Sequence, residues 1–332
     1  PVKRSHYVCA EGWINGAVNI KGEGDAPEIH FYDTVKGGDF LANQPLCKDM
    51  CYHAPFVIYL LDRLGVPFNR TPEGNLDFRR FGGTLHHRTA FAGATTGQQL
   101  LYALDEQVRR FETQGLVEKM EWHEYLGAVL DSEGRCVGAT INNLRTGEIR
   151  AERGDAVILA TGGPGLVYGR STNSMVCTGT ATTSAYLQGA KYGNAEFIQI
   201  HPSAIPGRDK LRLMSESARG EGGRVWVPKN PGDERKPRDV PEDERFYFLE
   251  EKYPRFGNLV PRDVGAREIY DICINQKLGV HGEMKVYLDL THKSREFLDE
   301  RLGGILEIYE KFTGVDPREE PMEIFPAVHY SM

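Results

Sequence analysis

The sequence predicts an α/β protein of about two domains, and three observations lead to this fold class. The chain has 332 residues, about twice the ~150 residues of a typical domain, so it can bury a large core. Most of its 37 glycines lie in the first two hundred positions, where short apolar runs alternate with loops. That texture is typical of α/β proteins whose backbone approaches a ligand closely. The run AVILA at 156–160 is uniformly apolar, which predicts a central strand buried on both faces.

Two helices are expected in the first part of the chain. Residues 54–65, APFVIYLLDRLG, fit a helix that Gly65 closes at its C-cap. A stronger helical pattern runs from Thr96 to Gln114. Its apolar residues recur on one face at helical spacing, and they are Leu100, Leu101, Leu104, Val108 and Phe111.

A β-meander is expected over residues 117–160. The apolar period changes there to that of strands in EKMEWHEYLGAVL, RCVGATINN and GEIRAERGDAVILA, with turns at DSEG and RTG. From about Phe197 the chain is richer in charge, Pro and Arg, and residues 227–245 predict a solvated surface loop. A second, smaller domain is therefore expected over about 197–321.

Composition and charge exclude several kinds of protein. Apolar residues make up 40% and charged residues 26% of the chain, as in ordinary globular proteins and unlike disordered ones. The 40 Lys and Arg and 47 Asp and Glu give a net charge of −7 without a dense basic stripe, so nucleic acid is not an expected partner. The apolar runs are shorter than the ~20 residues that cross a bilayer. The six cysteines form no CxxC pair, so we expect no metal site.

A glycine-rich turn follows the AVILA strand. Glycines at the carboxyl end of a parallel strand let the backbone approach a cofactor, where open α/β sheets bind ligands. A tight turn between strand and loop is the alternative. The dinucleotide-binding fingerprint GxGxxG is absent, because GEGDAP at 22–27 and RGEGGR at 219–224 lack its spacing and context.

Polar and charged side chains gather in the segments QIHPS and LMSESARGEGGRVW. These segments bring His201, Ser215, Glu216 and Arg219 within twenty positions of one another. Glu216 and Arg219 are spaced i, i+3, so a surface ion pair on a helix is the alternative to a catalytic pair.

Two further residues have a functional and a plain interpretation. Arg262 precedes Asp263 at the expected start of a helix, and the plain interpretation is a capping Asp beside an Arg without a role. His329 lies among apolar neighbours in AVHYSM. A single His in such surroundings is more often a core residue than a ligand.

Taken together, the motifs resemble the flavoprotein subunit family of succinate dehydrogenase and fumarate reductase. The strings RSHYVCAEGWINGA, GGDFLANQP, ATGGPG, STNS, EFIQIHPS, SESARGEGG, LVPRDV and FPAVHYSM occur in that family's order and approximate spacing, over essentially the whole chain. The resemblance is closest to the bacterial type that joins a two-haem membrane anchor.

This resemblance implies a fold and its domain boundaries. It implies an α/β FAD-binding domain, Rossmann-like, over residues 1–196 with a return at 322–332, and an inserted α+β capping domain over 197–321. In the family the GxGxxG fingerprint precedes the point where this chain begins. Since the chain also begins at Pro1 and ends within an apolar segment at Met332, we expect it to be an excerpt.

The resemblance also implies FAD as the cofactor. His6, in the pair Ser5-His6, matches the histidine that the family joins covalently to FAD. Tyr7 and Trp13 stand where relatives carry Ser or Thr and Gly, and a Trp there crowds the flavin. Thr180 stands in place of an Asp of the family. The residues expected to bind the cofactor are Ser5, His6, Ala10, Gly12, Thr161, Gly162, Gly163 and Thr180.

A dicarboxylate site is implied as well. His201 and Ser215 match the pair that holds one carboxylate of the substrate, and His329 matches the residue that holds the other. Charge-assisted hydrogen bonds of this kind contribute about 1.5 to 3 kcal/mol each.

By the same resemblance, Arg262 matches the arginine that moves the proton, with Glu216 and Arg219 as its relay to solvent. A free arginine has a pKa above about 12 and is a poor base. A carboxylate must therefore take the proton onward, which is the part expected of Glu216.

The expected reaction is oxidation of succinate to fumarate, or the reverse, by hydride transfer to or from FAD. Expected partners are an iron–sulfur subunit and a membrane anchor of the dihaem cytochrome b type, with the chain held peripherally at the cytoplasmic face of the inner membrane. L-Aspartate oxidase, which lacks the flavin-linking His, is one alternative. A flavin electron-transfer module with relic catalytic residues is the other, and the presence of all six site residues argues against it.

Overall fold

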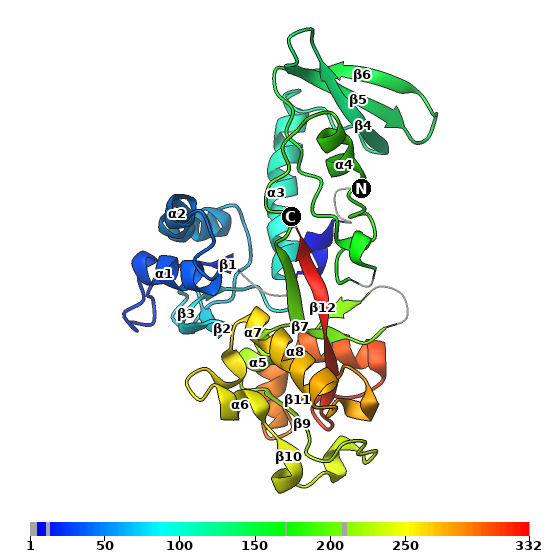
Figure 1. Cartoon of the computed structure of the whole chain (residues 1–332). Coiled ribbons are helices and arrows are strands. Elements are labelled where there is room, and N and C mark those ends of the chain that lie inside the picture. The colour runs from blue at the N-terminus through cyan, green and yellow to red at the C-terminus, as the bar shows by residue number, and fades with distance from the viewer. Residues whose placement is uncertain (1–4, 11–13, 170, 208–210, 332) are drawn as a thin grey trace.

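The described part of the chain folds into three antiparallel sheets surrounded by helices (Figure 1). This computed structural model describes residues 5–10, 14–169, 171–207 and 211–331. The helices among these residues are α1 (Pro27–Gly37), α2 (Gln44–Arg63), α3 (Thr96–Thr113), α4 (Thr180–Leu187), α5 (Ser217–Gly220), α6 (Phe248–Lys252), α7 (Arg262–Tyr270) and α8 (Arg295–Thr313). The strands are β1 (Ile14–Asn15), β2 (Phe78–Phe81), β3 (Thr84–Ala90), β4 (His123–Leu130), β5 (Cys136–Asn143), β6 (Ile149–Arg153), β7 (Ile198–Ile205), β8 (Arg212–Leu213), β9 (Arg224–Pro228), β10 (Arg245–Phe246), β11 (Val286–Asp289) and β12 (Met322–Ser331).

The two predicted helices form, and one of them is longer than expected. Helix α2 begins at Gln44 and not near residue 54, so Pro55 lies inside it, although proline normally favours the first turn. Helix α3 ends within one residue of the predicted boundary. Its apolar face is less buried than the pattern implies, since Leu104 is 48% exposed. No described segment covers that part of the face.

The predicted meander is present as the sheet β4-β5-β6, but its last strand is shorter than expected. Strand β6 ends at Arg153, and residues 154–164 form no strand. The prediction of a doubly buried central strand at 156–160 is therefore wrong for this structure, in which Ile158 is 88% exposed. A strand requires hydrogen-bonded neighbours along its edges, and no described strand pairs with this segment.

The largest sheet lies in the middle of the molecule, with the strand order β10-β9-β11-β12-β7-β8. In Figure 1, β12 and β7 run side by side from the β9–β11 region toward the end that carries α3 and α4. Helix α8 supplies five buried residues to the core beneath this sheet, and they are Leu298, Leu302, Ile305, Leu306 and Tyr309. The predicted surface loop at 227–245 is exposed over most of its length, although Val227 and Pro228 belong to β9 and Val240 is buried.

A small sheet of order β1-β3-β2 packs against α2 and α3 through Ile58, Phe78 and Ala103. The β2–β3 hairpin extends from it toward α5 and α7 (Figure 1). There the backbone N–H of Gly83 donates to the carbonyl of Leu259 at 2.9 Å. This contact joins two segments that are far apart in the sequence and places the hairpin beside the candidate site.

Candidate functional site

A cavity of about 2160 Å³ lies where three parts of the chain meet. It is lined by the first hundred residues, by the glycine-rich turn after β6, and by β7, α7 and β12. Its lining includes the predicted site residues Ser5, Ala10, Thr161, Gly162, Gly163, Arg262 and His329.

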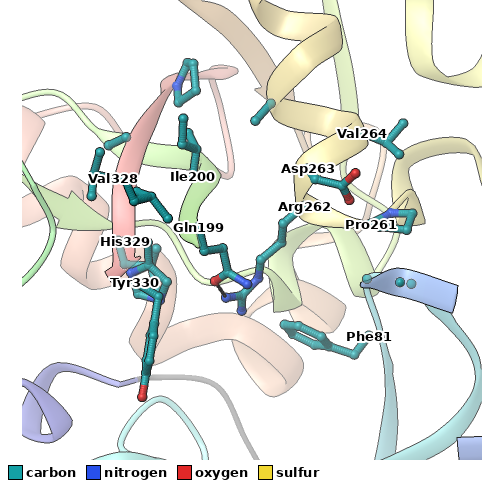
Figure 2. Close-up of a pocket in the computed structure, with 18 of the residues that line it drawn as sticks. Phe81, Gln199, Ile200, Pro261, Arg262, Asp263, Val264, Val328, His329 and Tyr330 are labelled. Atoms are coloured by element: carbon teal, nitrogen blue, oxygen red, sulfur yellow. Dashed lines mark hydrogen bonds between the residues drawn. The ribbon is translucent and has the colours of Figure 1, made fainter. Parts of the chain in front are cut away.

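Arg262 begins helix α7 and points into this cavity (Figure 2). The extended Pro261 before it fixes the first turn, since proline cannot donate a backbone N–H and is suited to a helix start. Nε of Arg262 donates to Oε2 of Glu216 at 2.8 Å, and Nη1 donates to Oε1 of Gln199 at 2.7 Å. The guanidinium also lies 5.7 Å from the ring centroid of Phe81, and these contacts hold it in one orientation.

Glu216 and Arg219 lie behind Arg262 and are buried. The second carboxylate oxygen of Glu216 accepts a hydrogen bond from Nη2 of Arg219. Nη1 of Arg219 donates to the carbonyl oxygens of Asn258, at 2.8 Å, and Val260, at 3.3 Å. Burial lowers the pKa of Arg219 from its usual range, and Glu216 partly offsets this shift. The three side chains thus form a continuous hydrogen-bonded row whose inner end is not at the surface.

His201 and His329 come together from neighbouring strands, with ring centroids 5.2 Å apart. The register between β7 and β12 shifts between Val328 and Tyr330, so His329 is the extra residue there. Such a bulge redirects a side chain. The Thr172 hydroxyl lies 2.6 Å from Nδ1 of His329 and fixes the ring.

His201 is fully buried and lies behind the cavity lining. Its Nδ1 accepts from the backbone N–H of Ser203 at 3.1 Å, so the proton of the neutral ring is on Nε2. Burial, together with the charge of Arg262, lowers the pKa of His201 well below its ordinary value and keeps the ring neutral. Nε2 has no hydrogen-bond partner within the described part of the chain and lies 3.8 Å from Oε2 of Glu216. It is a buried donor behind the cavity wall, beside the ring of His329.

Ser215 is brought near this group but not onto the cavity wall. It is fully buried, and its hydroxyl bonds to Oγ of Ser217 at 3.1 Å. The structure thus places Arg262 and His329 at the cavity, with His201, Ser215 and the Glu216–Arg219 pair behind them.

The glycine-rich turn also lines the cavity, beside the end of β12. Gly162 has a φ of +76°, and a Cβ at Gly163 would overlap the carbonyl oxygen of Ser331. The glycine at position 163 therefore lets the backbone of the turn approach the backbone of β12 closely. The hydroxyls of Ser5 and Ser331 line the cavity, and both are buried without a hydrogen-bond partner among the described residues. They leave polar positions for a ligand.

The other residues that were expected to bind the cofactor are not placed on the cavity wall by the described structure. The backbone of His6 begins a 3-10 turn, but its side chain lies outside the described set, as do Gly12 and Trp13. Thr180 begins α4, where its hydroxyl lies 2.5 Å from that of Thr178, and it is not among the residues that line the cavity.

Sequence reasoning missed three residues that hold the site together. Gln199 and Phe81 contact Arg262, and Thr172 contacts His329. Gln199 could have been found, because it precedes His201 by two positions and so shares its face of a strand. Thr172 lies in the string STNS that carries the family resemblance, although nothing local predicts its contact with His329. Phe81 carries no local signal, because its partner is distant in the sequence.

Comparison with known proteins identifies the family of the chain. The chain matches the FAD-binding domain family over residues 1–332, which confirms the predicted fold class. It is 68% identical to the succinate dehydrogenase flavoprotein subunit of Bacillus subtilis over 100% of this chain and 55% of that relative. It is 34% identical to the fumarate reductase flavoprotein subunit of Escherichia coli over 99% of this chain and 53% of that protein.

Solved structures of proteins with similar names also share the fold of this chain. A quinol–fumarate reductase with menaquinol molecules matches with a TM-score of 0.85 and 31% identity, over 99% of this chain and 55% of the other. Mycobacterium smegmatis Sdh1 in complex with UQ1 matches with a TM-score of 0.73 and 29% identity, over 100% of this chain and 54% of the other. The chain spans about half the length of the curated relatives it matches.

Proposed function

This chain belongs to the FAD-binding domain family, and from that membership we propose that it is part of the flavoprotein subunit of a succinate dehydrogenase or fumarate reductase. The proposed activity is the oxidation of succinate to fumarate or the reverse. The observation that carries the proposal is the row Arg262–Glu216–Arg219, which begins at a cavity wall beside His329. The glycine-rich turn that the family motif assigns to the flavin also lines this cavity.

The residues around the cavity fit the cofactor of the family. Bound FAD supplies the centre that accepts or gives the hydride. Ser5, whose buried hydroxyl has no partner among the described residues, and the backbone at Ala10, Gly162 and Gly163 line the side where it would be held. We further propose that His6 carries the covalent attachment, and that Gly12, Thr161 and Thr180 belong to the same cofactor site.

The two histidines and Ser215 are proposed to bind the carboxylates of the substrate. A dianion requires donors, and Nε2 of the neutral His201 is a buried donor without a partner in the described structure. His329 faces the cavity from the neighbouring strand. Two groups of donors on a rigid sheet orient the substrate, which lowers the entropic part of the barrier.

Arg262 is proposed to move the proton between the substrate carbon and Glu216. In the direction of succinate oxidation, Arg262 would take the proton from the substrate carbon as its Nε proton passes to Oε2 of Glu216, which lies 2.8 Å away. In the direction of fumarate reduction, both transfers would run in reverse. Arg219, on the far oxygen of the same carboxylate, is proposed as the next member of the relay. Because Arg219 is buried and donates to the carbonyls of Asn258 and Val260, the expected connection from it to solvent is not formed among the described residues.

We propose that the chain works in a membrane-bound complex. Electrons would leave through an iron–sulfur subunit to a quinone, and a dihaem cytochrome b anchor would hold the complex at the cytoplasmic face of the inner membrane. The relatives named as flavoprotein subunits support this. No helix among the described residues is long and apolar enough to span a bilayer.

The division into domains is a proposal as well. Residues 1–196 and 322–332 would belong to the FAD-binding domain, and 197–321 would form a capping domain. The cavity walls come from both parts, and β12 joins the two parts, because it pairs with β7 and β11 in one sheet. Closure of such a cap would exclude water from Arg262.

Steady-state assays of the complete complex test the proposed function. Succinate with an artificial acceptor, and fumarate with a reduced donor, should both turn over. Turnover of L-aspartate in their place would identify the aspartate oxidase alternative. Tight dicarboxylate binding without turnover would identify an electron-transfer module.

A further inference from the structure

The hairpin turn beside Glu216 contains two adjacent glycines, and a different constraint excludes a side chain at each position. Gly82 and Gly83 connect β2 to β3, and Phe81 pairs with Thr84 across the turn. Gly83 has a φ of +82°, a left-handed conformation that disfavours other residues. The φ of Gly82 lies outside that region. The backbone of the turn would therefore accept an alanine at position 82.

What excludes a side chain at Gly82 is the carboxylate of Glu216. A Cβ there would overlap Oε1 of Glu216 and would lie 2.8 Å from its Cδ. It would also lie 3.4 Å from Nη2 of Arg219. The space that Gly82 leaves open is thus occupied by the central member of the Arg262–Glu216–Arg219 row.

The turn is held by its own contacts, so it cannot easily move aside. The N–H of Gly83 donates to the carbonyl of Leu259, in the segment that leads into Arg262. At the other end of β2, Asp77 pairs with Arg301 at 3.7 Å, and Arg301 pairs with Glu221 at 2.9 Å. A methyl group at position 82 would therefore displace the end of a side chain, which moves more readily than the backbone.

We propose that Gly82 is a positioning residue for Glu216, and so sets the alignment of the proton relay. This inference rests on the proposed function, because the relay has a purpose only in dicarboxylate chemistry. Gly82 lines the cavity, but the role proposed here does not require it to contact substrate or cofactor. It acts by leaving the carboxylate within reach of Nε of Arg262.

The Gly82→Ala variant of the complete protein tests the inference, with Gly303→Ala as the matched control. A Cβ at Gly303, inside α8, meets no atom within 4 Å. Misplacement of a catalytic group by about 1 Å can cost about a hundredfold in rate. We expect Gly82→Ala to lower kcat by about that factor with little change in KM, and Gly303→Ala to leave both unchanged. A change in KM alone, or unchanged kinetics, would overturn the proposal.

A double-mutant comparison shows whether Gly82 acts through Glu216. In a Glu216→Gln background the added Gly82→Ala should lower kcat little further, because residues that act as a unit are not additive. If Gly82→Ala lowered kcat by the same factor with and without Glu216→Gln, Gly82 would not act through Glu216, and the proposed role would be contradicted. If Gly82→Ala alone does not fold or loses FAD, it is combined with Glu216→Asp. The shorter aspartate side chain would not reach the new methyl group, so the overlap would be relieved. Gly82→Ala should fold in that background, and failure there would mark the glycine as structural.

Crystal structures of the Gly82→Ala and unmodified proteins test the position of the Glu216 carboxylate without relying on an activity assay. The contact between Glu216 and Nε of Arg262 should be lost in the variant. A carboxylate that stays in place while the turn shifts would refute the inference. If the unmodified complex has no dicarboxylate activity, the proposed function fails while this structural comparison still stands.

Discussion

Oε2 of Glu216 accepts a hydrogen bond from Nε of Arg262 across 2.8 Å, although the Glu216 side chain has no exposed surface and Arg262 reaches the cavity. A buried carboxylate is stable only when cations and donors surround it, and here two guanidiniums do so. The pair therefore connects the cavity to the protein interior.

Replacement of Arg262 by alanine should remove an interaction that matters only as the C–H bond breaks. We expect kcat with succinate to fall by about 10² to 10⁴, as for loss of an acid–base group, with a modest change in KM. Arg262→Lys should recover a little activity, since an ammonium lacks the planar fork. His329→Ala should raise KM as well. Arg295→Ala, at an exposed position on α8 away from the cavity lining, is the control, and near-normal turnover of Arg262→Ala would disprove the assignment.

Glu216→Gln should affect both stability and turnover. The amide has nearly the same shape, but it leaves the buried guanidinium of Arg219 and the partly exposed guanidinium of Arg262 without their anion. Removal of one partner from a buried pair costs about 3 to 5 kcal/mol, so the free energy of unfolding should fall measurably in denaturant titrations, and kcat should fall with it. Glu319→Gln removes an exposed partner of Arg295 and should cost less than about 1 kcal/mol. Equal effects of the two variants would exclude a buried, relay-forming Glu216.

Covalent attachment at His6 has a direct chemical test. Acid precipitation of the complete protein should give a yellow pellet, because a bond to the imidazole survives unfolding. His6→Ser should give a colourless pellet and a yellow supernatant. Release of all flavin from the unmodified protein would show a non-covalent site and would favour the aspartate oxidase alternative.

His30 should make the protein less stable in mild acid. Burial, aided by the charge of Arg88 and opposed by Asp25, lowers the pKa of His30 from 6.5 to about 4. Between these values the unfolded chain binds more protons than the folded one, so stability falls as the pH falls from 6.5 toward 4. The loss from this one residue is at most about 3 kcal/mol.

Thermal unfolding at several pH values measures this contribution. His30→Gln should reduce the slope of stability against pH in that window, whereas His53→Gln, on the exposed side of α2, should not. An unchanged slope in His30→Gln would mean that other groups cause the acid sensitivity.

The sequence by itself determined the features that are encoded locally. Helical spacing from Thr96 predicted α3 to within a residue, and the alternating period with its two turns predicted β4 and β5. These signals are carried by neighbouring residues, so no tertiary information is needed to interpret them. The family motifs likewise identified Arg262 and His329, which the structure places at one cavity.

Only the tertiary structure decided which distant residues meet. The run 156–160 has the composition of a buried strand, yet it forms none, because a strand depends on neighbours that its own residues do not specify. Gly82 gives no sign in the sequence that it leaves room for Glu216, and Gln199 none that it holds Arg262. Such contacts arise when the hairpin, β7 and α7 pack together, and packing is set by the shape of all three elements and not by any one of them.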